Sequence, residues 1–348
     1  MENRSQCELS IIIPIYNGER YLRDTLDSVI GQSFTNYELI LVDDGSTDTT
    51  GAICEEYAQR DSRIKVLHQR NQGMSKARDA GYQMALPNTS IAFLDGDDNF
   101  DSRMLEDMMK YKDNDLVYTC FINIAGSKMK GYQFKEQTNA EQMNGKEMLN
   151  RLFTPRKNSG NMGCLWGSLI KREFYHKMEP IIHETEDVLP QNYLNDVYCI
   201  PRFLYYAERV TLLNKVYVLH RVSKYTDSRL LKPNALHYEL ALANKMNLDF
   251  YKEKQCDYAY EKHMIGFYLT ILKLWYQITT QEKDKDKIQK YVPQIQNYYD
   301  EYYSEFSHMR SESVSDKLVK WSIMLFHKNK TLWKVLVGDI RYGIMYRL

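Results

Sequence analysis

A run of four apolar residues, Leu39 to Val42, leads directly into Asp43, Asp44 and Gly45. An apolar run without alternation is typical of a central parallel strand that is covered on both faces. In open α/β sheets, ligands bind in the crevice beyond the carboxyl ends of such strands. Two carboxylates at that position cost desolvation free energy unless a cation or hydrogen-bond donors meet them. The run therefore predicts an α/β sheet with a polar site at the end of this strand.

A helix N-cap is the simpler interpretation of the polar residues after this run. Ser46, Thr47 or Asp48 could cap a helix that is predicted to begin near Thr49. A cap explains one or two polar residues, whereas the segment from Asp43 to Asp48 holds five. A second strand that ended in carboxylates would favour a ligand site over a cap.

Such a strand is predicted at residues 90–94, and Asp95, Asp97 and Asp98 follow it within one turn. Carboxylates in a tight turn offer the hard oxygen ligands that Mg²⁺ and Mn²⁺ prefer, and these ions often bridge carboxylates and substrate phosphates. The chain contains neither G-x-G-x-x-G nor G-x-x-x-x-G-K-[ST], the two glycine-rich phosphate-binding motifs. We therefore expect a divalent ion to neutralise any bound phosphate.

Strand and helix patterns alternate around these two segments. Strands are predicted at residues 9–14, 38–42, 64–68 and 90–94, and apolar residues at helical spacing lie between them. A series of this kind folds into a Rossmann-like, mostly parallel sheet flanked by helices, which is an α/β fold.

Four blocks of sequence resemble the family 2 glycosyltransferases in their order and spacing. They are residues 12–17 (IIPIYN), 42–48 (VDDGSTD), 73–81 (GMSKARDAG) and 93–98 (FLDGDD), and the resemblance covers roughly residues 8–225. It implies a GT-A fold, a nucleotide-sugar donor, a divalent metal ion and inversion at the anomeric carbon.

The resemblance also implies roles for single residues. The nucleotide pocket would be lined by Pro14, Tyr16, Asn17, Asp43, Asp44, Arg78 and Asp95. Asp44 would face the uracil, and Arg78 would lie near the diphosphate. Asp95 and Asp97, with Asp98 beside them, would match the D-x-D metal motif of the family, and Asp97 and Asp98 would hold Mn²⁺ or Mg²⁺.

An inverting transfer needs a general base that accepts the proton of the acceptor hydroxyl. In the family this base is an Asp, usually preceded by Glu, that opens a helix after the acceptor-side strand. Glu186-Asp187 matches the usual Glu-Asp pair of the family. However, the residues after Asn195-Asp196 and the later stretch 217–221 fit the family only if Asp196 is the base. We therefore predict Asp196 as the base, with Asn195 in place of the usual Glu, and Asp187 on an exposed loop.

The half of the domain that would bind the acceptor, about residues 125–230, has weaker patterns than the nucleotide-sugar half at about 8–124. Trp166 could stack on a sugar of the acceptor or belong to the core. Residues 125–145 are polar and weakly patterned, which predicts a loop over the site.

From about residue 234 onward the apolar spacing is helical, so we expect a GT-A domain at 1–230 and a helical C-terminal extension at 231–348. The last 32 residues, from Lys317 on, hold seven Lys or Arg and one acidic residue, together with Trp321 and Trp333. A basic amphipathic helix with tryptophans suits an anionic membrane surface. A packed helical tail or a dimer contact is the alternative.

The composition narrows the partners and the location. Lys plus Arg and Asp plus Glu are both 46, so no global charge favours nucleic-acid binding. The first eight residues lack the apolar core of a secretory signal, and no apolar run approaches the ~20 residues of a membrane span. We expect a cytoplasmic protein that can lie on the inner face of the cell membrane.

These features predict a metal-dependent transfer of a sugar, from a donor that we expect to be UDP-linked, to a glycan or lipid-linked acceptor in bacterial-type surface polysaccharide synthesis. A metal-dependent nucleotidyltransferase, which would release pyrophosphate, is one alternative. A nucleotide-binding module that has lost turnover because of Asn195 is the other.

Overall fold

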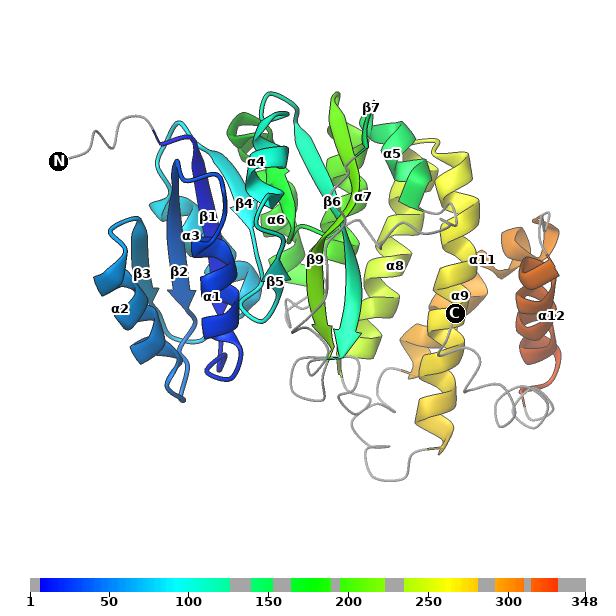
Figure 1. Cartoon of the computed structure of the whole chain (residues 1–348). Coiled ribbons are helices and arrows are strands. Elements are labelled where there is room, and N and C mark those ends of the chain that lie inside the picture. The colour runs from blue at the N-terminus through cyan, green and yellow to red at the C-terminus, as the bar shows by residue number, and fades with distance from the viewer. Residues whose placement is uncertain are drawn as a thin grey trace. The chain divides into compact units, whose positions relative to one another are not determined.

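A computed structural model describes residues 7–125, 139–152, 164–188, 195–222, 235–280, 292–309 and 314–330. The chain divides into two compact units, residues 1–230 and 231–348. All the strands within the described residues belong to the first unit (Figure 1).

The first unit is built on one mixed sheet. Within the described residues the strands follow the order β3-β2-β1-β4-β8-β6-β9-β5, and β7 pairs with β9. The strands are β1 (Leu9–Ile15), β2 (Tyr37–Asp43), β3 (Ile64–His68), β4 (Ser90–Phe93), β5 (Asn99–Phe100), β6 (Leu116–Ala125), β7 (Ala140–Met143), β8 (Ser168–Ile170) and β9 (Val210–Val222).

The strands β3, β2, β1 and β4 are parallel neighbours, and every residue of β1 and β2 is buried. Helices α1 (Leu22–Ile30), α2 (Thr50–Arg60) and α3 (Met74–Met84) connect them, and α4 (Met104–Met109) follows β5. In the register of the sheet, Ile15 lies opposite Asp43 and Ile12 lies opposite Phe93. The loops that follow β1, β2 and β4 therefore leave the sheet at one edge, and the predicted mostly parallel sheet is confirmed.

The other half of the sheet is mixed. Strand β8 runs antiparallel to β4 and β6, whereas β6 and β9 are parallel. Strand β5 is antiparallel to β9, with Asn99 opposite Leu219, so the residues just before β5 lie against the end of β9. Helices α5 (Gly145–Leu152), α6 (Arg172–Val188) and α7 (Asn195–Tyr206) belong to this half.

Two local predictions were wrong. Residues 140–143 form a strand along β9, not part of a loop, while residues 126–138 lie outside the described part. No apolar alternation marks this strand in the sequence, because its residues are half-exposed or exposed. Asp187 lies in α6 and not on a loop, because buried residues at helical spacing, Phe174, Met178 and Ile182, continue across Pro180.

The second unit is helical. It contains α8 (Ala235–Glu253), α9 (Asp257–Thr280), α11 (Val292–His308) and α12 (Val314–Lys328). These helices enclose a separate apolar core that includes Leu248, Phe267, Tyr299, Phe306 and Phe326. None of the helices in the described residues is long and apolar enough to span a membrane.

Candidate active site

The acidic turn, which we define as Asp95 to Asp98, follows β4 and is fixed by the end of β9. Asp98 is fully buried, and its Oδ1 accepts a hydrogen bond of 2.9 Å from the backbone N–H of Arg221. His220 Nδ1 lies 3.1 Å from the same oxygen. The Nε of Arg221 donates to the carbonyl oxygen of Asp97 at 2.8 Å. Two consecutive residues of β9 therefore fix the backbone of the turn.

The carboxylate of Asp97 is the open group of this turn. No other side chain in the described residues donates a hydrogen bond to it or forms an ion pair with it. Burial, together with the charges of Asp98 and Asp95, raises the pKa of Asp97 to about 8. Burial is the largest cause of this rise and the neighbouring carboxylates add to it, so a bound cation would favour the ionised form of Asp97.

The side chains of the acidic turn suit a divalent ion that is bound partly by the protein and partly by a ligand. Among the residues that the structure describes, no three His, Cys, Asp or Glu side chains lie close enough together to hold a metal ion by themselves. Mg²⁺ is usually bound by one or two carboxylates and completed by waters and substrate phosphates. Asp97 can supply such a carboxylate, whereas both the ring of His220 and the backbone of Arg221 already engage Asp98.

Arg78 brings together two carboxylates that are distant in the sequence. Its Nη2 lies 3.1 Å from Oδ1 of Asp95, and its Nη1 lies 3.4 Å from Oδ1 of Asp196, in the first turn of α7. Burial raises the pKa of Asp196, and the charge of Arg78 opposes that rise. The residue predicted as the base thus lies beside the acidic turn, although 118 residues separate it from Arg78.

Two buried polar atoms near this ion pair lack a hydrogen bond within the described chain. They are Nε of Arg78 and the hydroxyl of Tyr118, a residue of β6 that is 1% exposed. Burial, and next the charge of Asp196, raises the pKa of Tyr118. A buried polar group without a partner costs about 1–3 kcal/mol, so these atoms mark a place where a water or a ligand oxygen would be stabilised. The sequence did not single out Tyr118, since one tyrosine in a buried strand carries no motif.

Asp43 and Asp44 shape the loops beside the site. Asp44 accepts hydrogen bonds from the backbone N–H groups of Gln72 and Gly73 at 2.9 and 2.8 Å. Asp43 accepts one from the backbone of Ser46 at 3.0 Å and lies 2.9 Å from Nδ1 of His68. Both carboxylates therefore order the loops after β2 and β3, and a contact of either with a nucleotide stays a prediction.

The loop after β1 presents an aromatic ring at the same edge. Tyr16 is 54% exposed, while Pro14 is buried within β1. Asn17 has a φ of 51°, and its side-chain oxygen accepts a hydrogen bond from the backbone of Thr47 at 2.8 Å. The loops after β1 and β2 are thus joined, and the exposed ring of Tyr16 offers a flat apolar face.

Trp166 lies beside the acidic turn, next to Phe93 at the end of β4. Its indole stacks on the imidazole of His220, with ring centroids 4.9 Å apart and an angle of 20° between the planes. Its ring also contacts Phe121 and packs against the core of the first unit. The structure thus supports core packing for Trp166, and the predicted acceptor contact remains untested. The sequence did not identify His220 or Arg221, because both lie in an ordinary strand pattern.

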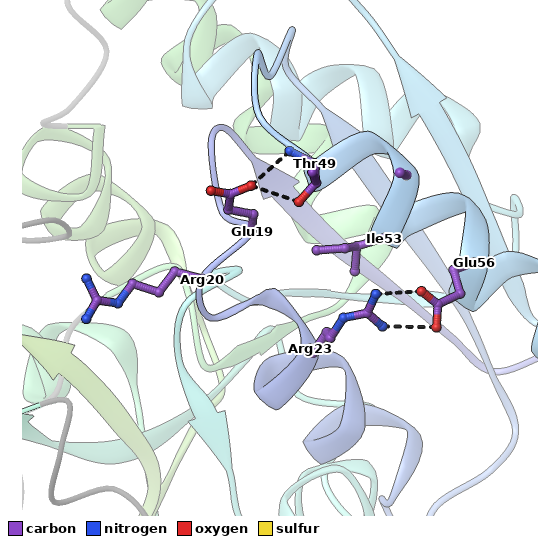
Figure 2. A pocket seen from close by; sticks show the side chains of 7 residues that line it. Glu19, Arg20, Arg23, Thr49, Ile53 and Glu56 are labelled. Carbon is purple, nitrogen blue, oxygen red and sulfur yellow. Dashed lines mark hydrogen bonds and ion pairs between the residues drawn. The ribbon is translucent and has the colours of Figure 1, made fainter.

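A cavity of about 640 Å³ lies elsewhere, between α1 and α2. Figure 2 shows two interacting pairs among its lining residues: Glu19 accepts two hydrogen bonds from Thr49, and Arg23 forms a bidentate ion pair with Glu56. None of the predicted site residues lines this cavity.

Comparison with known proteins agrees with this geometry. The sequence profile of Glycosyl transferase family 2 matches residues 10–177. The glycosyltransferase GlyG of Streptococcus pneumoniae is 30% identical over 220 residues, which are 61% of this chain and 70% of GlyG. The chain belongs to glycosyl transferase family 2. The resemblance of the four sequence blocks to this family is therefore confirmed.

Two further comparisons describe how far the family relationship extends. The glycosyltransferase GlyA of S. pneumoniae is 29% identical over 273 residues, which are 74% of this family 2 chain but only 36% of GlyA. The structure of residues 1–349 of S. aureus TarS in complex with UDP aligns with a TM-score of 0.50 and 18% identity, covering 88% of this chain and 94% of that one. At this identity the likeness shows a shared fold, and it confirms the predicted GT-A architecture.

Proposed function

We propose that this chain transfers a sugar from a nucleotide-sugar donor to an acceptor hydroxyl, with inversion at the anomeric carbon. The observation that carries the proposal is the bridge made by Arg78, which joins Asp95 of the acidic turn to Asp196. An inverting transfer needs the donor and the base of the acceptor within reach of each other. The Arg78 bridge supports that arrangement.

The donor is a UDP-sugar in this proposal. Pro14, Tyr16 and Asn17 lie in β1 or directly after it, at the same sheet edge as Asp43 and Asp44. The ring of Tyr16 offers a face on which a base can stack. That TarS, which shares the fold, was solved with UDP supports a uridine nucleotide.

The diphosphate would lie near Arg78 and the acidic turn. Mn²⁺ or Mg²⁺, when bound, offsets the negative charge that develops on the departing diphosphate. Asp97 is the residue that we propose as its ligand, because its carboxylate is open and uncompensated. Asp98, the second predicted ligand, also shapes the turn through His220 and Arg221.

Asp196 would accept the proton of the acceptor hydroxyl as the hydroxyl oxygen attacks the sugar. A base must be ionised to act, and burial works against ionisation. Burial leaves the pKa of Asp196 raised, and the charge of the Arg78 guanidinium limits that rise. Arg78 would thus have two roles, one toward the base and one toward Asp95 and the donor.

The experiment that tests the function is a screen of nucleotide sugars with Mn²⁺ in which released nucleoside diphosphate is measured. We expect release that depends on the donor and is stimulated by acceptor. Release of pyrophosphate would indicate a nucleotidyltransferase. Clear binding of UDP without release from any donor would indicate a module that has lost turnover.

The acceptor in this proposal is a glycan or a lipid-linked glycan of surface polysaccharide synthesis, reached from the inner face of the membrane. Helix α12 supports that location. Its face with Ile323 and Phe326 is buried, whereas Lys317, Trp321 and Lys328 are exposed at helical spacing. An exposed tryptophan between lysines suits the interface of an anionic bilayer.

A further inference from the structure

Backbone contacts fix the position of Trp166 beside the acidic turn. It forms a parallel bridge with Phe93, the last residue of β4, and the N–H of Gly167 donates to the carbonyl oxygen of Phe93 at 2.9 Å. Gly167 has a φ of 71°, and a Cβ there would lie 3.1 Å from Val218 of β9. The chain at Trp166 is thus pinned between the strand that enters the turn and the strand that holds it.

The side chain of Trp166 contacts the residue that holds the turn. Its ring lies nearly parallel to that of His220, with the ring centroids 4.9 Å apart. The ring centroid of Phe121, a residue of β6, lies 4.6 Å from that of the indole. The imidazole of His220 is partly exposed, with a side chain 25% accessible, and stacking opposes its rotation about the side-chain bonds. With the ring fixed, Nδ1 of His220 stays 3.1 Å from Asp98.

We infer that Trp166 is a positioning residue for the acidic turn, acting through His220. The stack keeps His220 on the carboxylate of Asp98, and Asp98 in turn keeps the backbone that presents Asp97. This inference rests on the proposed function in one respect: Asp97 is taken to serve metal-dependent nucleotide binding. In this inference Trp166 acts by packing on His220, and not by the direct contact with the acceptor that the sequence suggested.

Two substitutions of Trp166 by residues of similar size test whether its aromatic face positions the acidic turn. Trp166→Leu keeps an apolar group against the core but removes the flat aromatic face, whereas Trp166→Phe keeps a ring that can stack. Hydrogen–deuterium exchange of the ligand-free full chain is measured on the peptide that covers the acidic turn. We expect several-fold faster exchange there for Trp166→Leu and near-wild-type exchange for Trp166→Phe. The peptide that covers β3, which is remote in the sheet order, reports any general loosening.

A second measurement follows the consequence for the ligand. Calorimetric titration of UDP with and without Mn²⁺ should show about tenfold weaker binding of UDP by Trp166→Leu in Mn²⁺ and unchanged binding without it, as is typical when a residue that orients a metal ligand is lost. In a His220→Asn background, Trp166→Leu should have no further effect, since the stack is already absent.

Unchanged exchange of the acidic turn in Trp166→Leu would overturn the inference. So would a raised KM for the acceptor with wild-type binding of UDP and Mn²⁺, which is the result expected of a sugar-stacking residue. If the wild-type chain shows no metal-dependent binding of UDP, the proposed function fails, and the exchange experiment still decides whether Trp166 positions the turn.

Discussion

Arg78 is a single buried cation between two carboxylates. It is 5% exposed, and its ion pairs with Asp95 and Asp196 leave the group of three with one net negative charge. Removal of one partner of a buried ion pair leaves an uncompensated charge that costs several kcal/mol. Substitution of Arg78 would therefore change both the stability of the protein and the chemistry of the site, so its variants cannot separate the two effects.

The base can be tested with two carboxylates that are nine positions apart in the sequence. Loss of a general base lowers the rate by typically 10²- to 10⁴-fold and spares donor binding, so we expect Asp196→Asn to lose kcat by about that factor with nearly unchanged affinity for UDP. Asp187→Asn, in α6, is the matched control and should retain most activity. Both are assayed with one donor and one acceptor. An inactive Asp187→Asn beside an active Asp196→Asn would mean that the base is misassigned.

The two predicted metal ligands should respond differently to loss of charge. Asp97→Asn should weaken the binding of UDP in Mn²⁺ while leaving the melting temperature near that of the wild type, because no other side chain in the described chain depends on this carboxylate. Asp98→Asn should lower the melting temperature, because the fully buried carboxylate engages His220 and Arg221. Calorimetry and thermal unfolding measure the two effects. Equal affinity of wild type and Asp97→Asn in Mn²⁺ would remove Asp97 from the metal site.

Sequence reasoning could place the residues that belong to short motifs but not those that support them. Asp95, Asp97 and Arg78 stand in blocks whose spacing is informative, and Asp196 follows from the register after it. His220 contacts Asp98 across 122 residues, and that contact depends on how β5 pairs with β9. No local pattern encodes such a pairing, so the partners of the acidic turn became visible only in the structure.

Helix α3 positions Arg78 by packing closely on β1 and β2. A Cβ at Gly81 would lie 2.4 Å from Cγ2 of Ile12 and 3.1 Å from Cγ2 of Val42. Both of these methyl groups belong to β-branched side chains in buried strands, so they cannot move away easily. The small residues that the sequence shows in α3 are thus explained by contact between a helix and the sheet, whereas strand β7 could not be predicted because its pattern is largely polar.

A matched pair of glycines tests this packing. Gly81→Ala should destabilise the protein by about 1–2 kcal/mol, since overpacking costs about 1–3 kcal/mol and the better helix propensity of alanine returns less than 1 kcal/mol. Gly266→Ala, in α9, should instead stabilise by about 0.5–1 kcal/mol, because nothing lies within 4 Å of the added methyl group. Denaturant unfolding measures both. The packing argument is wrong if the two changes have the same sign.

At the scale of the whole molecule, each unit has its own core and its own response to its surroundings. The first unit buries apolar strands between helices, and the second buries aromatic side chains among four described helices.

Acid should destabilise the second unit through one histidine. Burial lowers the pKa of His263, whose ring lies 5.4 Å from that of Tyr251, to about 4. The unfolded chain, with a pKa of about 6.5, binds the proton more readily, so stability is lost as the pH falls from 6.5 toward 4. Between pH 7.5 and pH 5 the wild type should lose about 2 kcal/mol more unfolding free energy than His263→Gln, which cannot be charged. Equal losses in denaturant unfolding would show that His263 is not the titrating group.

Association with anionic membranes should depend on the exposed side of α12. Each basic residue near such a surface contributes about 1 kcal/mol, so Lys317→Gln with Lys328→Gln should weaken binding to vesicles by about 30-fold, and Trp321→Ser should weaken it further. Tyr258→Ser, which removes an exposed aromatic residue of the same unit, is the control. Sedimentation with phosphatidylglycerol vesicles at low and high salt provides the measurement. Without binding of the wild type at low salt, α12 is a packing element.

The pairing of β5 with β9 also has a consequence for the order of events during synthesis. Strands β1 to β4 can pair as soon as they leave the ribosome, because their connections are local. The acidic turn lies directly after them, yet the residues that fix it, His220 and Arg221, emerge more than 120 residues later. At about 5–20 residues per second, the nascent chain carries the carboxylate of Asp98 without these two partners for about 6–24 s. During that interval the acidic turn lacks the contacts that fix it, and β9, the last strand of the described chain, completes the turn when it joins the sheet.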